Sequence, residues 1–221
     1  MRQIKDYDFI VDRMPLSAEA NMQKDRELFE NFKGNAPPVF RLYRWEESFT
    51  CGVSQKLEEM DFRYGKSSAK RITGGGILLH GHDISYSIIC SSDFVKGKSV
   101  KEGYEFLCGF LMDFYRSLGL KPSFAKDLDG IELQKSSFCQ VGFEPYDIII
   151  DGKKIGGNAQ KRARDKILQH GSIPIKKIDH PHGGYSLEDL GVYLSYDEAT
   201  DMLLESFKGF MRKNSKKETD I

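Results

Sequence analysis

The stretch PYDIIIDGKKIGGNAQKR, residues 145–162, decides the fold of this chain. Its Asp151-Gly152 pair follows a β-branched run, and an Asp-Gly pair is a preferred turn of a two-residue β-hairpin. Successive side chains of a strand point to opposite faces, so Lys153 and Lys154 are expected on different sides, with one of them facing the interior. The stretch therefore predicts an antiparallel hairpin that carries a lysine into the protein.

The residues after these lysines form an unusual strand. Gly156, Gly157, Asn158, Ala159 and Gln160 give up both side-chain packing and β-propensity. Close approach of a ligand to this backbone would explain the loss. A lysine aimed into the same cleft can bind a carbonyl or carboxylate group, or lower the pKa of a neighbouring thiol.

Regular elements are expected on both sides of the hairpin. Strands are predicted at 9–11, 37–45, 48–53 and 167–175 and on either side of the glycines at 74–76, with 48–53 as the antiparallel neighbour of 37–45. Helices are predicted at 17–33, at 99–119 with a Ser99/Glu102 capping box and a Gly119 C-cap, near residue 187, and from about residue 197. The chain shows no internal repeat and no low-complexity linker. We therefore expect one α+β domain, residues 1–213, with a mostly antiparallel β-sheet flanked by helices, and a polar tail at 214–221.

The composition is that of a globular protein. Hydrophobic residues make up 39% of the 221 residues, and 33 basic residues balance 33 acidic ones. This balance argues against nucleic acid or a membrane surface as the partner. No apolar run approaches the roughly 20 residues of a membrane span, and the N-terminus lacks the apolar core of a signal peptide. The four cysteines have neither disulfide nor zinc spacing, so we expect free thiols in the cytoplasm.

Two motifs contain residues of the types that bind ligands, although a glycine-rich turn is equally often structural. KRITGGG, residues 70–76, is neither a Walker loop nor GxGxxG before a helix, but its glycines can form an anion or oxyanion site, and Arg71 and Thr73 favour a ligand loop. His80, His82 and Asp83 follow it, but no further ligand is spaced to complete a metal site, so no metal is expected. His170 and the histidines at 180 and 182 are interpreted as polar groups of the sheet and loops.

Cys139 lies in KSSFCQVGFEPYD, residues 135–147, which leads into the hairpin. A thiol in a loop beside lysine-bearing strands is a candidate nucleophile. The alternative for Cys139, and the expectation for Cys51, Cys90 and Cys108, is a small buried hydrophobic residue.

In this order, the motifs resemble those of the biotin/lipoate-protein ligase superfamily, over about Asn21 to Ile175. KRITGGGILLHGHDISYSI is similar to the superfamily's Arg-Arg-x-Thr-Gly-Gly-Gly…His segment, and DGKKIGGNAQKR with LQHGSI is similar to its lysine segment and the His-Gly strand that follows. The resemblance implies the catalytic-domain fold of these ligases and a site for an acyl group and a carrier protein. The residues implied to line that site are Arg71, Thr73, Gly74, Gly75, Gly76, His80, Gly157, Asn158, Ala159, Gln160 and His170.

SSFCQVGFEPYDIIIDGKK is most similar to the cysteine-dependent octanoyltransferases, which carry Ser-Ser-x-Cys, a Tyr-acid pair and the lysine hairpin. That resemblance implies that Cys139 is the acyl-accepting nucleophile and Lys154 its partner. The expected reaction moves an octanoyl group from an acyl-carrier protein through an acyl-Cys139 thioester to a lysine of a lipoyl domain or of a glycine-cleavage H-type protein. Passing a thioester on to an amide runs downhill, so no cofactor is required.

Two features depart from the octanoyltransferase pattern. Those enzymes usually have arginine where the loop here ends in Gly76, which is the ligase-like version. The chain is also too short for the accessory C-terminal domain of many lipoate ligases. Three alternatives therefore stay open: a lipoate–protein ligase using ATP and Mg, an amidotransferase between lipoyl proteins, and a non-catalytic lipoyl-binding protein. Cys139 favours the transferase.

Overall fold

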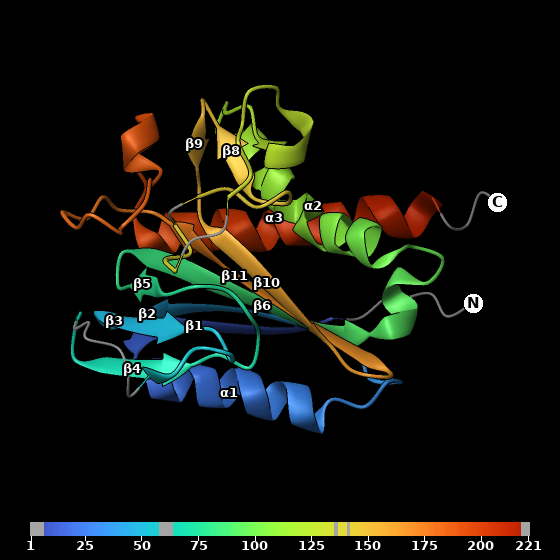
Figure 1. Cartoon of the computed structure of the whole chain (residues 1–221). Coiled ribbons are helices and arrows are strands. Elements are labelled where there is room, and N and C mark those ends of the chain that lie inside the picture. The colour runs from blue at the N-terminus through green and yellow to red at the C-terminus, as the bar shows by residue number, and fades with distance from the viewer. Residues whose placement is uncertain (1–6, 58–63, 135–136, 141, 218–221) are drawn as a thin grey trace.

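The computed structural model describes residues 7–57, 64–134, 137–140 and 142–217, and a five-stranded sheet lies at the centre of that part (Figure 1). In sheet order its strands are β1 (Asp8–Leu16), β2 (Val39–Trp45), β6 (Asp83–Ser91), β11 (Lys166–Pro174) and β10 (Gly157–Arg162). Only β1 and β2 run parallel within this sheet, and the other neighbours are antiparallel. The predicted mostly antiparallel sheet is confirmed.

Helices cover both faces of this sheet (Figure 1). The helix α1 (Ala18–Asn31) covers one face, and α2 (Val100–Ser117) and α3 (Tyr196–Lys217) pack together on the other. On β6, Ile88 packs into the cluster with α2 and α3, while its neighbour Ile89 packs against Phe29 of α1. Alternate side chains of one strand thus enter two cores, each worth about 1.5–3 kcal/mol per buried large apolar side chain. The α+β prediction is confirmed.

The helix ends follow the sequence. Ser17 accepts a hydrogen bond from the backbone N–H of Ala20, and Ser99 and Glu102 form the predicted capping box of α2. Gly119 follows α2 with a φ of 79°, a conformation that glycine adopts without strain. At the C-terminal end α3 continues to Lys217, four residues beyond the predicted domain boundary at 213.

The predicted pairing of 48–53 with 37–45 is wrong. Both edges of β2 are already occupied, by β1 and β6, so the chain leaves this sheet after Trp45. It builds a second sheet, in which β3 (Ser48–Cys51) lies between β4 (Ser67–Lys70) and β5 (Leu78–His80). This sheet lies on the same side of the molecule as α1 (Figure 1).

The hairpin at Asp151-Gly152 is confirmed, but it is shorter than predicted. It joins β8 (Ile148–Ile150) to β9 (Lys153–Lys154), and β7 (Ser123–Phe124) completes this third sheet. Gly156, with a φ of 74°, then redirects the chain into β10 at the edge of the five-stranded sheet. A Cβ at Gly156 would lie 2.0 Å from the carbonyl oxygen of Ser172, so only glycine allows this crossing between sheets. Among the described helices, none has the length and apolarity to cross a membrane.

Candidate active site

A cleft opens where the three sheets meet. It is partly open to solvent and is lined by side chains from all three sheets. The predicted site residues that line it are Arg71, Gly74, Gly75, Gly76, His80, Cys139, Lys154, Gly157, Asn158, Ala159 and His170. Two predicted residues are not part of the lining. Thr73 is hydrogen-bonded to His170 Nε2, and Gln160 lies farther along β10, where its side-chain amide donates to Gln169 Oε1. The cleft therefore brings together most of the residues named from the sequence.

Backbone hydrogen bonds fix the loop that carries Cys139. The N–H of Ile77 donates to the carbonyl of Ser137 at 2.8 Å, and the N–H of Cys139 donates to the carbonyl of Ile77 at 2.7 Å. Residues 137–139 are thereby aligned beside the end of the glycine loop. Ser136, the first serine of the Ser-Ser-x-Cys motif, lies outside the described residues.

Two glycines give the Cys139 loop its space. A Cβ at Gly157 would lie 2.6 Å from the Cys139 Sγ, and a Cβ at Gly76 would lie 2.5 Å from the Ser137 carbonyl oxygen and 2.9 Å from the Cys139 nitrogen. These distances are shorter than van der Waals contact. A Cβ at Gly76 would meet backbone atoms, so position 76 accepts no side chain while the loop stays in place, whereas a Cβ at Gly157 would displace the Cys139 sulfur. The close packing at both positions explains why the sequence has glycine there.

Lys154 is the hairpin lysine that faces the interior, as the alternation predicts. It is 5% exposed, and its Nζ lies 2.6 Å from Asp147 Oδ2 and donates to the Gly142 carbonyl at 3.3 Å. Burial raises the pKa of Asp147, and the charge of Lys154 partly offsets that rise. Lys153 points away and donates to the Asp189 carbonyl at 3.1 Å. The catalytic candidate is thus half of a buried ion pair.

Cys139 differs from the other three cysteines. Cys51, Cys90 and Cys108 are fully buried, as expected of small hydrophobic residues, whereas Cys139 is partly exposed in the cleft. Burial raises the pKa of the Cys139 thiol above its ordinary value, although Lys154 and then Arg71 act to lower it. The Cys139 thiol is thus subject to opposing influences, burial on one side and the charges of Lys154 and Arg71 on the other.

Arg71 holds the glycine loop in shape. Its Nη1 donates to Thr50 Oγ1 at 2.7 Å, and its Nη2 donates to the carbonyls of Gly76 at 2.6 Å and Gly74 at 3.3 Å. Gly75 has a φ of 100°, which a residue with a side chain rarely adopts. The loop carbonyls thus face a guanidinium group within the cleft wall.

The histidines act as polar groups of the sheets and loops. Burial lowers the pKa of His80, so its Nδ1–H donates to Asp83 at 2.9 Å and its Nε2 accepts from Thr50 at 2.8 Å. The ring nitrogens of His82 are buried with no hydrogen-bond partner, while His182 stacks on Phe138 at 3.7 Å. Within the described ranges, no group of three or more His, Cys, Asp or Glu side chains is placed to hold a metal ion.

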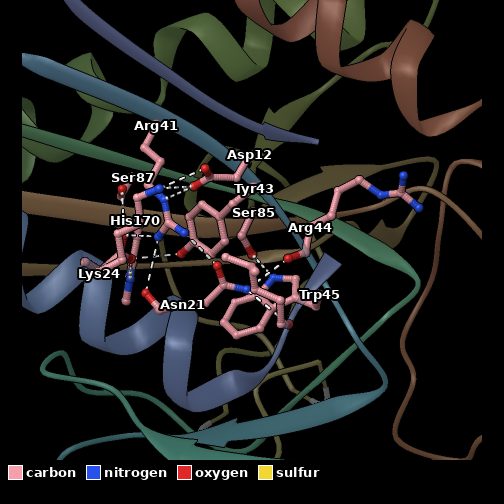
Figure 2. Close-up of polar contacts among 12 residues, drawn as sticks. Asp12, Asn21, Lys24, Arg41, Tyr43, Arg44, Trp45, Ser85, Ser87 and His170 are labelled. Carbon is pink, nitrogen blue, oxygen red and sulfur yellow. Dashed lines mark hydrogen bonds and ion pairs between the residues drawn. The ribbon is translucent and has the colours of Figure 1, made fainter. Parts of the chain in front are cut away.

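A buried polar network beneath the cleft was missed by the sequence analysis (Figure 2). Arg41 of β2 is fully buried and donates to Asp12 at 2.8 Å, to Asp25 at 2.8 Å and to Asn21 Oδ1 at 2.6 Å. Asn21 and Asp25 are one helical turn apart on the buried face of α1, next to Met22. In the sequence, this network could have been detected from two polar residues on the apolar face of a helix.

This network reaches the cleft through His170. Asp25 Oδ2 accepts from the Tyr43 hydroxyl at 2.9 Å and from His170 Nδ1 at 3.3 Å, and the other ring nitrogen of His170, Nε2, is hydrogen-bonded to Thr73 Oγ1 at 2.6 Å. Burial acts to raise the pKa of Asp25, but His170 and Arg41 together hold it below its ordinary value. An ionised carboxylate under the sheet thereby orients a histidine at the floor of the cleft.

Comparisons with known proteins agree with this geometry. The family model described as Lipoyl protein ligase A/B catalytic domain matches residues 17–180. The chain is 36% identical to octanoyltransferase LipM of Bacillus cereus over 154 residues, covering 63% of this chain and 55% of the relative. It is 34% identical to octanoyltransferase LipM of Oceanobacillus iheyensis over 173 residues, covering 75% and 63%. The chain thus spans less than two thirds of the length of either relative.

A solved structure shares the fold. The structure of a lipoate protein ligase from T. acidophilum with bound lipoic acid superposes with a TM-score of 0.74 at 20% identity, covering 94% of this chain and 86% of that one. This likeness shows the shared fold, and the family match covers most of the length of the chain. The chain belongs to the lipoyl protein ligase A/B catalytic domain family, within the lipoate/biotin protein ligase superfamily.

Proposed function

We propose that this chain is an octanoyltransferase that carries the acyl group on Cys139 and delivers it to a lysine of a lipoyl domain. One observation carries the proposal: the thiol of Cys139 lies in the same cleft as Lys154 and the glycine loop, with its sulfur against the side-chain-free backbone of Gly157. The relatives named octanoyltransferase LipM support the same acyl chemistry.

The first step forms the acyl-enzyme. The sulfur of Cys139 attacks the thioester carbonyl of an octanoyl-acyl-carrier protein, the carbon–sulfur bond to the carrier breaks, and the carrier thiolate takes up the proton that Cys139 lost. Exchange of one thioester for another is nearly isoergic, so no ATP is required. In this scheme, backbone N–H groups near the glycine loop or the hairpin hold the oxyanion.

The second step transfers the acyl group to protein. The neutral ε-amine of the acceptor lysine attacks the acyl-Cys139 carbonyl, an amide forms, and the sulfur leaves and recovers a proton from the amine. The acceptor is a lipoyl domain or a glycine-cleavage H-type protein, and the reaction takes place in the cytoplasm. Lys154, held by the Asp147 carboxylate, orients the carbonyl for this attack.

Intact-protein mass spectrometry after mixing with octanoyl-acyl-carrier protein tests the first step. Wild-type protein is expected to gain one octanoyl group that hydroxylamine removes, and Cys139→Ser is expected to lose this thioester. Cys90→Ser is the matched control, because Cys90 is buried away from the cleft and burial raises its pKa to about 12. A hydroxylamine-labile adduct that persists unchanged in Cys139→Ser would contradict the proposal.

The alternatives differ in their donor. A lipoate–protein ligase would modify the lipoyl domain only with free lipoate, ATP and Mg²⁺, and an amidotransferase would require an octanoylated or lipoylated protein as donor. A non-catalytic binding protein would hold lipoate without turnover and without an acyl-cysteine. Incubation of the same lipoyl domain with each donor in turn separates these outcomes from the carrier-dependent transferase.

A further inference from the structure

The cleft contains two buried cations, and only one of them has a counter-charge. The Nζ of Lys154 lies 2.6 Å from the Asp147 carboxylate, so this pair contributes little net charge. Arg71 is 5% exposed, and within the described ranges its hydrogen-bond acceptors are the Thr50 hydroxyl and the backbone carbonyls of Gly74 and Gly76. No described carboxylate lies within ion-pair distance of its guanidinium group.

The charge of the other buried arginine, Arg41, is balanced by carboxylates. Arg41 is fully buried and forms ion pairs with Asp12 and Asp25, each at 2.8 Å. The chain of hydrogen bonds from Arg71 through Thr50 and His80 does end at Asp83, but Asp83 is paired directly with His80. A buried cation without its own anion is costly, and such residues cluster at functional sites.

The fold couples Arg71 to the nucleophile. Arg71 donates to the carbonyl of Gly76, and the next residue, Ile77, holds Cys139 through a 2.7 Å backbone hydrogen bond. Cys139 is also the leading charge that raises the pKa of Arg71, which burial lowers overall. The groups whose charges act on the sulfur are Lys154 and Arg71, which favour the thiolate, and Asp147 and Glu144, which oppose it.

We infer that Arg71 supplies the net positive charge that stabilises the Cys139 thiolate, while Lys154 is largely neutralised by Asp147. This assignment rests on the proposed function for its catalytic meaning and concerns how that same site ionises. Loss of the thiol proton to solvent leaves a sulfur anion in the same cleft as the guanidinium group of Arg71, which has no carboxylate partner among the described residues. Arg71 is thus a positioning residue for charge as well as for the glycine loop.

The pH dependence of Cys139 alkylation by iodoacetamide, followed at the Cys139 peptide by mass spectrometry, tests this inference without any acyl donor. Arg71→Gln and Arg71→Met are expected to move the alkylation midpoint to higher pH by about one unit, which is a roughly tenfold lower rate below the midpoint. Arg71→Lys keeps the charge and is expected to restore most of the wild-type profile. Arg44→Gln is the control, because Arg44 lies over Tyr196 outside the cleft.

The variant Lys154→Met/Asp147→Asn provides an independent arm, because it removes both charges of the pair and keeps Arg71. Its alkylation profile is expected to stay near that of the wild type. The inference is overturned if folded Arg71→Gln or Arg71→Met titrates like the wild type, if Arg71→Lys shifts as far as the neutral variants, or if removal of the pair shifts the midpoint more than half a unit. Failure of the proposed function would show separately, as absence of octanoyl transfer to Cys139.

Discussion

The sulfur of Cys139 lies against the backbone of Gly157, so closely that a Cβ at position 157 would come within 2.6 Å of it. The two residues belong to different parts of the chain, a loop held by Ile77 and the first residue of β10. In the proposed reaction, the acyl group on the sulfur begins at this contact. It also makes the position of the thiol sensitive to one methyl group.

Gly157→Ala is therefore expected to lower the rate of Cys139 acylation by at least about tenfold, because the added methyl group displaces the sulfur, and a displacement of about 1 Å can cost 10²-fold in rate. Single-turnover acylation with octanoyl-acyl-carrier protein measures this. Gly209→Ala is the matched control outside the cleft, because a Cβ at Gly209 on α3 meets no atom within 4 Å. Equal rates for the two variants would show that the contact does not position the thiol.

Asp147→Asn is expected to reduce the free energy of unfolding by about 3 kcal/mol, because it leaves the buried ammonium group of Lys154 without its carboxylate. Urea denaturation of the variant and the wild type measures the difference. The double variant Lys154→Met/Asp147→Asn should recover most of the loss, since it removes the stranded charge as well. Asp127→Asn, which breaks a surface pair with Lys126, should change stability little.

Asp25→Asn is expected to destabilise the fold by about 3 kcal/mol and to slow acyl transfer, because Asp25 binds Arg41 under the sheet and orients His170 in the cleft. Urea denaturation and single-turnover transfer measure the two effects. Asp201→Asn, at an exposed ion pair with Arg13, serves as the control for loss of a carboxylate. Normal transfer by a folded Asp25→Asn protein would limit the network to a structural role.

His82 gives the stability a pH dependence of known sign. Burial lowers its pKa from 6.5, so the unfolded chain binds a proton at a higher pH than the folded protein does. The stabilisation is complete above pH 6.5 and is lost as the pH falls from there towards the lowered pKa, at up to about 1.4 kcal/mol per pH unit for one group. His82→Leu, which also removes two unpartnered ring nitrogens, should flatten this slope in urea titrations between pH 7 and 5. An unchanged slope would assign it to other groups, such as His80, whose pKa burial also lowers.

Local sequence patterns were enough to predict the hairpin, the helix caps and the inward-facing lysine, because each depends on a few neighbouring residues. The partner of β3 was not predictable in this way, since it depends on β1 and β6 having already occupied both edges of β2. The sheet crossing at Gly156 was missed for a similar reason. The group that requires glycine at this position is the carbonyl of Ser172, sixteen residues away along the chain. Long-range contacts of this kind leave no local periodicity to detect.

The same distinction holds in the site. Cys139, Lys154 and the glycine loop were named from motifs, and the structure places them in one cleft. The ion pair of Lys154 with Asp147 and the Asp25 network required coordinates, because polar residues on a predicted apolar face do not reveal their partners. The glycines at 76 and 157 were noted as unusual, but only the position of Cys139 explains them.

The loop that carries Cys139 is attached to Ile77 through main-chain atoms, which every amino acid except proline supplies in full. Residue 139 can therefore change without loss of those attachments, provided that the new side chain is no larger than the space beside Gly157. These attachments are thus independent of the thiol, whereas the proposed acyl transfer depends on it. In descendants of this chain, a cysteine at 139 is expected to be retained where the proposed chemistry is under selection, and its replacement by serine or alanine would remove that chemistry from an intact scaffold.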